Sequence, residues 1–255
     1  MKAILVAGGH GSRLYPFTRY THKTLLPLHR RPVIDYALAT IRRANITDIT
    51  IIGNRFIGQI AQHVGTGLPG ENIHYVIEEE PLGVHHALNL ARPHVEGSRV
   101  LLYFSDNITT IELTDAVDEF RNSVSPPGCA LVGRNVEDPE RFGVAVFDTE
   151  QRLVDIVEKP VKPPSSFAIG GIYLYDETFW TRLDAVVAEK GSNMSITDVN
   201  RTYVNENSAS IIQSKDSLWI DCGTPDALFE ASQLAAEGKL SAEPCNARDD
   251  DPPLE

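Results

Sequence analysis

Residues 3–27 read AILVAGGHGSRLYPFTRYTHKTLLP, in which an apolar run passes directly into a glycine-rich segment. Residues 3–7 predict a β-strand, because a strand that is buried on both faces carries continuous apolar side chains. The residues that follow are Gly8, Gly9, His10, Gly11, Ser12 and Arg13. Glycines after a strand let backbone N–H groups approach a phosphate closely, and an arginine adds a fixed cationic fork. The segment therefore predicts a nucleotide-phosphate loop, although a simple tight turn would use the same glycines.

Two common phosphate-binding motifs do not fit this segment. The third glycine of GxGxxG would stand at position 14, which is Leu14, and the GxxxxGK[ST] spacing is also absent. The glycine loop therefore needs support from other parts of the chain before it indicates a function.

The first half of the chain alternates short apolar runs with amphipathic stretches of helical length. This alternation predicts a parallel sheet covered by helices. The predicted strands are Ala3–Ala7, Ile49–Ile52, Ile73–Ile77 and Val100–Phe104. The predicted helices are one that has Pro32 at its first position and reaches Ala44, then Ile57–Val64, Val84–Ala91 and Leu113–Val124.

The second half of the chain changes to closely spaced β-type runs, which favour an antiparallel or mixed sheet and hence a second lobe. These runs occupy residues 130–134, 143–148, 153–159 and 168–176. Further elements are predicted as helices at Ile196–Val204 and Asp226–Ala236, with a strand at Ser217–Ile220 between them. Residues 241–255 are rich in Pro and Asp and hold little that could be buried, so we expect a flexible tail there.

The composition is that of a globular protein with an acidic charge balance. The chain has 255 residues, of which 42% are hydrophobic and 23% charged, so it lies outside the disordered and collagen-like classes. Lys and Arg number 23 against 35 Asp and Glu, which gives a net charge of −12. This charge argues against nucleic acid or an anionic membrane as a general partner. An anionic ligand must therefore be met by a local cluster of cations.

The three cysteines, Cys129, Cys222 and Cys245, show neither CxxC nor a Cys/His ligand spacing. The sequence thus indicates neither a disulfide framework nor a structural zinc site, which is typical of a reducing compartment. The apolar run at 3–7 is too short for a signal peptide, and no run reaches membrane-spanning length. We therefore expect a soluble, cytoplasmic protein.

Residues 8–27 resemble the signature GGxGTRLxPxTxxxxKxLLP of the sugar-1-phosphate nucleotidyltransferases, the NDP-sugar pyrophosphorylases. Later segments continue the resemblance in family order. They are EEEPLG at 78–83, FSDN at 104–107, RFGVAVFD at 141–148, EKP at 158–160, IGGIYLYD at 169–176, SITDVN at 195–200 and WIDCGTPDALFEAS at 219–232. The similarity thus spans residues 3–232, and its second half is most similar to the glucose-1-phosphate thymidylyltransferase branch.

This resemblance implies an α/β nucleotidyltransferase fold, in which a mostly parallel, Rossmann-like sheet is flanked by helices and carries a β-rich sugar-binding lobe. We expect one domain over residues 1–240, followed by the tail. Residues 1–127 would form its nucleotide-binding half, and residues 128–240 would bind the sugar and supply one metal-binding aspartate. Homo-oligomers are common in the family, so we also expect a homo-oligomer.

The chemistry that the resemblance implies is an in-line attack by the phosphate of a sugar 1-phosphate on the α-phosphorus of a nucleoside triphosphate, which releases pyrophosphate. Such transfers depend on positioning and charge neutralisation more than on covalent help from the protein. Arg13 and Lys23 would hold the triphosphate, Asp106 and Asp221 would bind Mg²⁺, and Lys159 would contact the sugar phosphate. Without the resemblance, these residues would be interpreted as surface cations and as turn-forming or helix-capping aspartates.

The family pattern also implies two sets of binding residues. The nucleotide would be contacted by Ala7, Gly8, Gly9, Gly11, Ser12, Arg13, Lys23, Glu78, Gly83, His86 and Asp106. The sugar would be contacted by Asn107, Gly143, Glu158, Lys159, Gly171, Tyr173 and Trp219. An exposed ion pair for Glu158 and Lys159, and a core position for Tyr173, are the alternatives.

The sequence departs from the thymidylyltransferase pattern where the base would bind. Glu78 stands at a position where that branch usually has glutamine, and Thr24 replaces another frequent glutamine. An ionised glutamate only accepts hydrogen bonds, which suits the two adjacent N–H donors of guanine better than thymine. The leading hypothesis is an enzyme that uses dTTP and glucose 1-phosphate. The alternatives are a guanylyltransferase that makes a GDP-sugar or GDP-cyclitol, and a non-catalytic regulator that binds nucleotide sugars.

Overall fold

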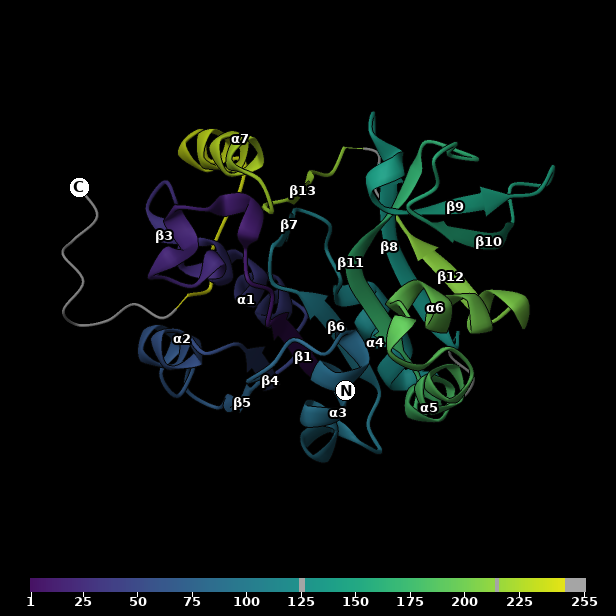
Figure 1. Cartoon of the computed structure of the whole chain (residues 1–255), viewed down its shortest axis with the longest axis horizontal. Helices are drawn as coiled ribbons and strands as arrows, with labels where there is room; N and C mark the ends of the chain where they lie inside the picture. The colour runs from purple at the N-terminus through teal and green to yellow at the C-terminus, as the bar shows by residue number, and fades with distance from the viewer. Residues whose placement is uncertain (124–126, 214–215, 246–255) are drawn as a thin grey trace.

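Strand β1 (Lys2–Ala7) lies inside a mixed nine-stranded sheet. The structure is a computed structural model and describes residues 1–123, 127–213 and 216–245. The strands parallel to β1 are its neighbours β4 (Asp48–Gly53) and β6 (Val100–Phe104), with β5 (Asn72–Ile77) pairing with β4 at the edge. The predicted parallel strands of the first half are thereby confirmed, with bounds that differ by one residue at most (Figure 1).

The second half of the chain extends the same sheet through β11 (Phe167–Tyr175), which pairs antiparallel with β6. Further strands attach to β11, directly or through a neighbour. They are β8 (Cys129–Asn135), β9 (Gly143–Phe147), β10 (Leu153–Glu158) and β12 (Ala209–Ile212). The expected change from a parallel to a mixed sheet is therefore correct, and both halves share one continuous sheet.

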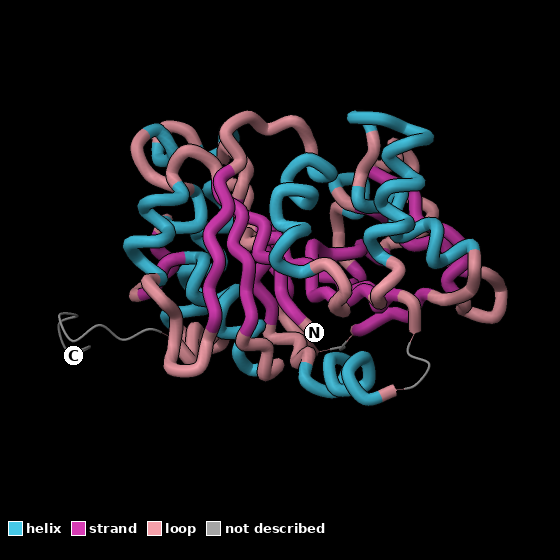
Figure 2. The backbone as a smooth tube through the Cα atoms, turned by 90° about the horizontal axis from the view of Figure 1, so that it is seen from below, coloured by secondary structure: helices cyan, strands magenta, loops and turns pink. Residues whose placement is uncertain are grey.

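Helices cover the sheet in two layers (Figure 2). One face packs against α1 (Val33–Arg43), α2 (Ile57–Val64) and α4 (Thr114–Asn122). The other packs against α3 (Val84–Val95), α5 (Phe179–Lys190) and α6 (Ile196–Asn205). Successive side chains of β1 point to opposite faces of the sheet, so both faces are apolar and can be covered by helices. Ala3, Leu5 and Ala7 lie in one core cluster, and Ile4 lies in the other.

A third, smaller cluster lies beside the main sheet. It joins α1 to α7 (Pro225–Ala236) and to a two-stranded ribbon of β7 (Asn107–Thr109) and β13 (Trp219–Asp221). A second ribbon pairs β2 (Pro27–Leu28) with β3 (Arg31–Pro32). Short 3₁₀ turns complete the described elements at Ser12–Leu14, Phe17–Arg19, Lys23–Leu25, Pro139–Arg141 and Gly191–Asn193.

Several predicted boundaries need correction. Pro32 caps α1 instead of occupying its first turn, because its ψ of 158° is extended. The strand expected at Ser217–Ile220 begins at Trp219, and Val124, the predicted end of α4, lies outside the described residues. Among the described helices and strands, those that were not predicted are α5, β2, β3, β7 and β12.

The beginning of the predicted tail is packed against the domain. Ala242 is buried, and the carbonyls of Glu243 and Pro244 accept hydrogen bonds from Arg43 and Arg42 of α1, at 2.9 and 3.3 Å. Residues 241–245 are therefore anchored, and the rest of the predicted tail lies outside the described residues. In the described part of the chain, the helices are too short or too polar to cross a membrane.

Candidate active site

The loop that follows β1 lies at the carboxyl end of the parallel strands, where open α/β sheets bind their ligands. Gly8 and Gly11 show why glycine is needed there. A Cβ on Gly8 would collide with a carboxylate oxygen of Glu78, and Gly11 has a left-handed φ of +62°. The Thr18 hydroxyl donates a 2.9 Å hydrogen bond to the Gly11 carbonyl. The turn is therefore held in place from inside the protein, while Gly9, Ser12 and Arg13 remain exposed.

Lys23 and Asp106 form an ion pair in front of this loop. The Lys23 ammonium donates a hydrogen bond to Oδ2 of Asp106, and only 14% and 16% of the two side chains are exposed. Burial alone would raise the pKa of Asp106, but the adjacent ammonium, together with hydrogen bonds from the Asp106 backbone and the Asn107 side chain, holds that pKa below its ordinary value. Asp106 is therefore a carboxylate at neutral pH.

Pairing of β13 with β7 brings Asp221 opposite Asn107 and next to Asp106. The backbone N–H of Cys222 donates a 2.8 Å hydrogen bond to the Asp106 carbonyl. Burial, followed by the negative charge of Asp106, raises the pKa of Asp221. The structure thus brings together the two aspartates predicted to bind metal, although they lie far apart in the sequence.

These two carboxylates fit a divalent cation, since a cation between them would relieve the repulsion that raises the pKa of Asp221. Among the residues that the structure describes, no three His, Cys, Asp or Glu side chains gather into a complete protein ligand set. A bound cation would therefore complete its shell with water and phosphate oxygens, as Mg²⁺ does at nucleotide sites.

The Arg13 guanidinium lies close to Asp221. A Cβ placed on Gly223 would lie 2.7 Å from Nη2 of Arg13 and 2.9 Å from Oδ1 of Asp221, so both side chains lie against this glycine. The Arg13 charge also lowers the pKa of Asp221, against the effects of burial and of Asp106. Both cations predicted to hold the triphosphate thus lie at the aspartate pair.

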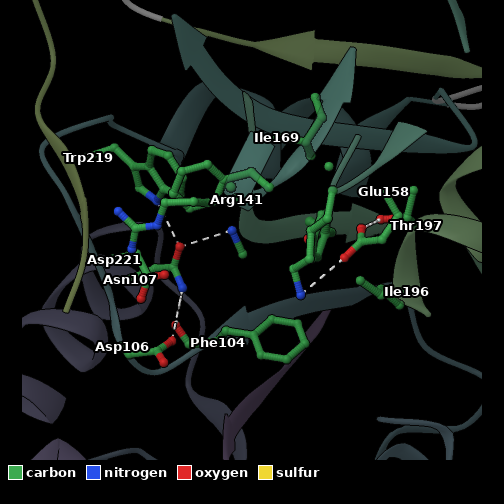
Figure 3. A pocket seen from close by; sticks show the side chains of 16 residues that line it. Phe104, Asp106, Asn107, Arg141, Glu158, Ile169, Ile196, Thr197, Trp219 and Asp221 are labelled. Carbon is green, nitrogen blue, oxygen red and sulfur yellow. Dashed lines mark hydrogen bonds and ion pairs between the residues drawn. The ribbon is translucent and has the colours of Figure 1, made fainter. Parts of the chain in front are cut away.

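A pocket of about 220 Å³ opens beside the aspartates (Figure 3). All the residues predicted to contact the sugar line it, namely Asn107, Gly143, Glu158, Lys159, Gly171, Tyr173 and Trp219. Lining residues that were not singled out from the sequence include Phe104, Arg141, Phe142, Ile169, Ile196 and Thr197. Each of these six residues lies inside a segment that resembles the family. The family resemblance could therefore have identified them as pocket residues.

Asn107 connects the walls of this pocket to the aspartates. Its amide oxygen accepts hydrogen bonds from Trp219 Nε1 at 2.8 Å and from the backbone N–H of Gly171 at 3.0 Å. Its amide nitrogen donates to Oδ1 of Asp106 at 3.1 Å and to the Phe104 carbonyl at 3.2 Å. Because the amide is engaged on all sides, Asn107 orients Asp106 and Trp219 in this structure.

Glu158 and Lys159 occupy the far wall of the pocket. Oε2 of Glu158 accepts a 2.5 Å hydrogen bond from the Thr197 hydroxyl, and Oε1 lies 3.5 Å from the Lys159 ammonium. Lys159 has a φ of +43°, a strained conformation for a lysine, and its N–H donates to the Phe142 carbonyl at 2.9 Å. Its side chain is 66% exposed and lines the pocket, so the ammonium is accessible to a ligand there.

A second pocket of about 220 Å³ lies against the glycine loop. It is lined by Val6, Gly8, Gly9, Glu78, Pro81, Gly83, Val84, Ala87 and Phe104. Only 5% of Glu78 is exposed, and burial raises the pKa of its carboxyl group. Phe104 lines both pockets, so the two cavities are neighbours.

Three residues predicted at or near the nucleotide do not line either pocket. Ala7 is fully buried, and its carbonyl accepts a hydrogen bond from His22. His86 lines a separate surface depression with Ile77 and Leu82, although its charge lowers the pKa of the nearby Glu78. Thr24 is also fully buried and lines neither pocket.

His22 makes stability depend on pH. Burial lowers its pKa from 6.5 to about 4, so the folded protein holds it neutral while the unfolded chain protonates it below 6.5. This contribution is complete above pH 6.5 and is lost as the pH falls toward 4, by about 3 kcal/mol in total. Urea denaturation at pH 7 and 4.5 should show a larger loss in wild type than in His22→Gln, and equal losses would contradict the assignment.

Comparisons with known proteins point to one family. The sequence profile of the nucleotidyl transferase family matches residues 2–238. The low-salt glycan biosynthesis nucleotidyltransferase Agl11 of Haloferax volcanii is 32% identical over 241 residues, which cover 94% of this chain and 67% of that protein. The glucose-1-phosphate thymidylyltransferase of Xanthomonas campestris pv. campestris is 36% identical over 237 residues, which cover 91% of this chain and 80% of that protein.

Solved structures show the same similarity in three dimensions. A Bacillus anthracis protein assigned as a glucose-1-phosphate thymidylyltransferase, in complex with sucrose, superposes with a TM-score of 0.85 at 35% identity, over 92% of this chain and 95% of that chain. An apo UDP-glucose pyrophosphorylase, at 20% identity and a TM-score of 0.80, shares the fold. Since the profile match extends over nearly the whole domain and relatives agree with it in both sequence and fold, the chain belongs to the nucleotidyl transferase family and is an enzyme of that family.

Proposed function

We propose that this enzyme transfers a thymidylyl group from dTTP to glucose 1-phosphate. One observation carries the proposal: a continuous line of groups joins the two pockets. Gly9 lines the second pocket and lies beside the Lys23 ammonium, Lys23 pairs with Asp106, and Asp106 lines the pocket beside Trp219. A nucleotide in one pocket and a sugar phosphate in the other would therefore meet at the aspartates. The names of the relatives favour thymine and glucose as the base and sugar.

The reaction would proceed in one displacement. An oxygen of the sugar phosphate attacks the α-phosphorus, the bond from that phosphorus to the bridging oxygen breaks, and pyrophosphate leaves with the electron pair. Arg13 and Lys23 hold the triphosphate and neutralise charge that develops on the leaving group. Lys159 orients the attacking phosphate, and Glu158 accepts hydrogen bonds from sugar hydroxyls. Mg²⁺ held by Asp106 and Asp221, when bound, supplies further positive charge at the phosphates.

The direct test is pyrophosphate release with dTTP, UTP, GTP, CTP and ATP, each against a panel of sugar 1-phosphates, with and without Mg²⁺. We expect the highest kcat/KM for dTTP with glucose 1-phosphate, and no turnover without a divalent cation. A different preferred pair would reject the substrate assignment, and silence with every pair would favour a non-catalytic binding protein.

The protonation state of Glu78 would affect which nucleobase the enzyme prefers. When it is protonated, its carboxyl group donates one hydrogen bond and accepts another, which is the pattern that the O4 and N3–H of thymine require. Its burial favours this protonated form. When it is ionised, the group only accepts, and then the N1–H and N2–H donors of guanine suit it better. Guanylyl transfer to a sugar or cyclitol phosphate is therefore the second candidate.

Replacing Glu78 by glutamine separates the two candidates. For a thymidylyltransferase, Glu78→Gln should keep or raise kcat/KM for dTTP and flatten its decline with rising pH, because the amide never ionises. For a guanylyltransferase, the same change should lower kcat/KM for GTP by about tenfold, since one charge-assisted hydrogen bond is lost. Steady-state kinetics with both triphosphates from pH 5 to 8 decide between them, and a variant that alters neither would remove Glu78 from base recognition.

A further inference from the structure

His22 connects the two segments that flank the glycine loop. It is 1% exposed and lies between the end of β1 and the 3₁₀ turn Lys23–Leu25. Its Nε2 is within hydrogen-bond distance of the Ala7 carbonyl. Its Nδ1 lies 2.7 Å from the Thr24 hydroxyl and 3.2 Å from the Thr24 backbone nitrogen.

The partners of the ring determine its protonation state. The Ala7 carbonyl can only accept, so Nε2 carries the hydrogen, and the Thr24 N–H can only donate, so Nδ1 accepts. The ring is therefore neutral and held in one tautomer. Burial favours the same state, although the Lys23 and Asp106 charges act on the ring with opposite signs.

The two ends of this link are next to groups of the site. Ala7 directly precedes Gly8 and Gly9, which line the second pocket, and His22 directly precedes Lys23, which pairs with Asp106. The glycines between them have a flexible backbone, so anchoring on both sides sets where Lys23 and the loop N–H groups point.

We propose that His22 is a positioning residue of nucleotidyl transfer, which holds the glycine loop and Lys23 in the one relative geometry that receives the triphosphate. This inference rests on the proposed function, because it assigns the loop and Lys23 to the phosphates. It does not depend on which base or sugar is used. Thr24 contributes to the same positioning, because its hydroxyl and its N–H contact Nδ1 and hold the His22 ring in place.

Two variants of His22 test the hydrogen bonds of its two ring nitrogens separately. The amide of His22→Gln reaches the place of Nε2 and can donate to the Ala7 carbonyl, whereas the shorter amide of His22→Asn reaches the place of Nδ1 and leaves that carbonyl unpaired. Val186 is a buried residue of α5 that lines neither pocket, so Val186→Ala serves as a control for lost stability alone. All variants are assayed below their melting temperatures with the triphosphate that the wild-type enzyme turns over. The comparison of kcat values is therefore valid even if that triphosphate is not dTTP.

We expect His22→Asn to lower kcat by about tenfold, the effect of one buried hydrogen bond, with KM for the sugar 1-phosphate unchanged. His22→Gln should restore kcat to within about threefold of wild type. The proposal is overturned if His22→Asn loses stability but keeps wild-type kcat, as Val186→Ala should, or if His22→Gln is no better than His22→Asn.

A measurement on the wild-type protein makes the test independent of whether the variants fold. Nitrogen-15 NMR of the His22 ring at pH 7 should show a protonated Nε2 and an unprotonated Nδ1. A ring protonated on both nitrogens, or on Nδ1 alone, would contradict the link to Ala7 and overturn the proposal.

Discussion

Asp106→Asn is expected to lower kcat by about 10³-fold while the protein stays folded. The change removes a negative charge at the point where both pockets meet, and with it the partner of Lys23 and one of two candidate Mg²⁺ ligands. An asparagine of the same shape can still accept the hydrogen bond from Asn107, so the surrounding strands are retained. Pyrophosphate release at saturating substrates and Mg²⁺ gives kcat, and circular dichroism reports the fold.

A matched control for this variant is Asp118→Asn, the same chemical change on the exposed side of α4. Its kcat should equal that of wild type. If Asp106→Asn keeps kcat within tenfold of wild type, Asp106 has no part in the transfer, and the proposed position of the metal ion is wrong.

Lys159→Ala is expected to lower kcat/KM for the sugar 1-phosphate by about 10²-fold with no change in melting temperature. The ammonium lies at the mouth of the pocket beside Glu158, where it can meet the attacking phosphate. Its side chain is largely exposed, and an exposed ion pair contributes at most about 1 kcal/mol to stability. The kinetic effect should therefore appear without a structural one.

Lys162→Ala provides the comparison, because Lys162 is an exposed lysine on the same segment that does not line the pocket. We expect wild-type kinetics for it. Equal, small effects of both changes would indicate that general positive charge, and not the strained backbone position of Lys159, attracts the sugar phosphate.

Much of the secondary structure could be predicted because it depends on local patterns. β1, β4, β5 and β6 follow from apolar runs, and α2 agrees in both bounds with its helical spacing. Helix α5 was missed although Phe179, Trp180, Leu183 and Val186 stand at helical spacing and are buried, so its signal was present. By contrast, β7 and β12 are short and form only by pairing with strands distant in sequence, which no local pattern indicates.

In the candidate site, too, some features could be predicted from the sequence and others depend on contacts between distant segments. The roles of the residues at positions 13, 23, 106, 159 and 221 could be predicted from the resemblance, since each lies in a segment of the family pattern. Their mutual distances, and the use of the Asn107 amide to hold Asp106 and Trp219, could not be inferred, because three separate strands supply these contacts.

The sequence by itself determined the α/β architecture, the glycine loop and the family, because periodicity, backbone freedom and residue order are all encoded locally. Only the tertiary structure decided that burial and the charge of Asp106 raise the pKa of Asp221, that Glu78 is buried over Gly8, and that Thr24 supports His22 instead of lining a pocket. The physical reason is that burial and charge depend on which distant segments pack together. These neighbours set the pKa of a carboxyl group or the tautomer of a ring, and the residue's own place in the sequence does not.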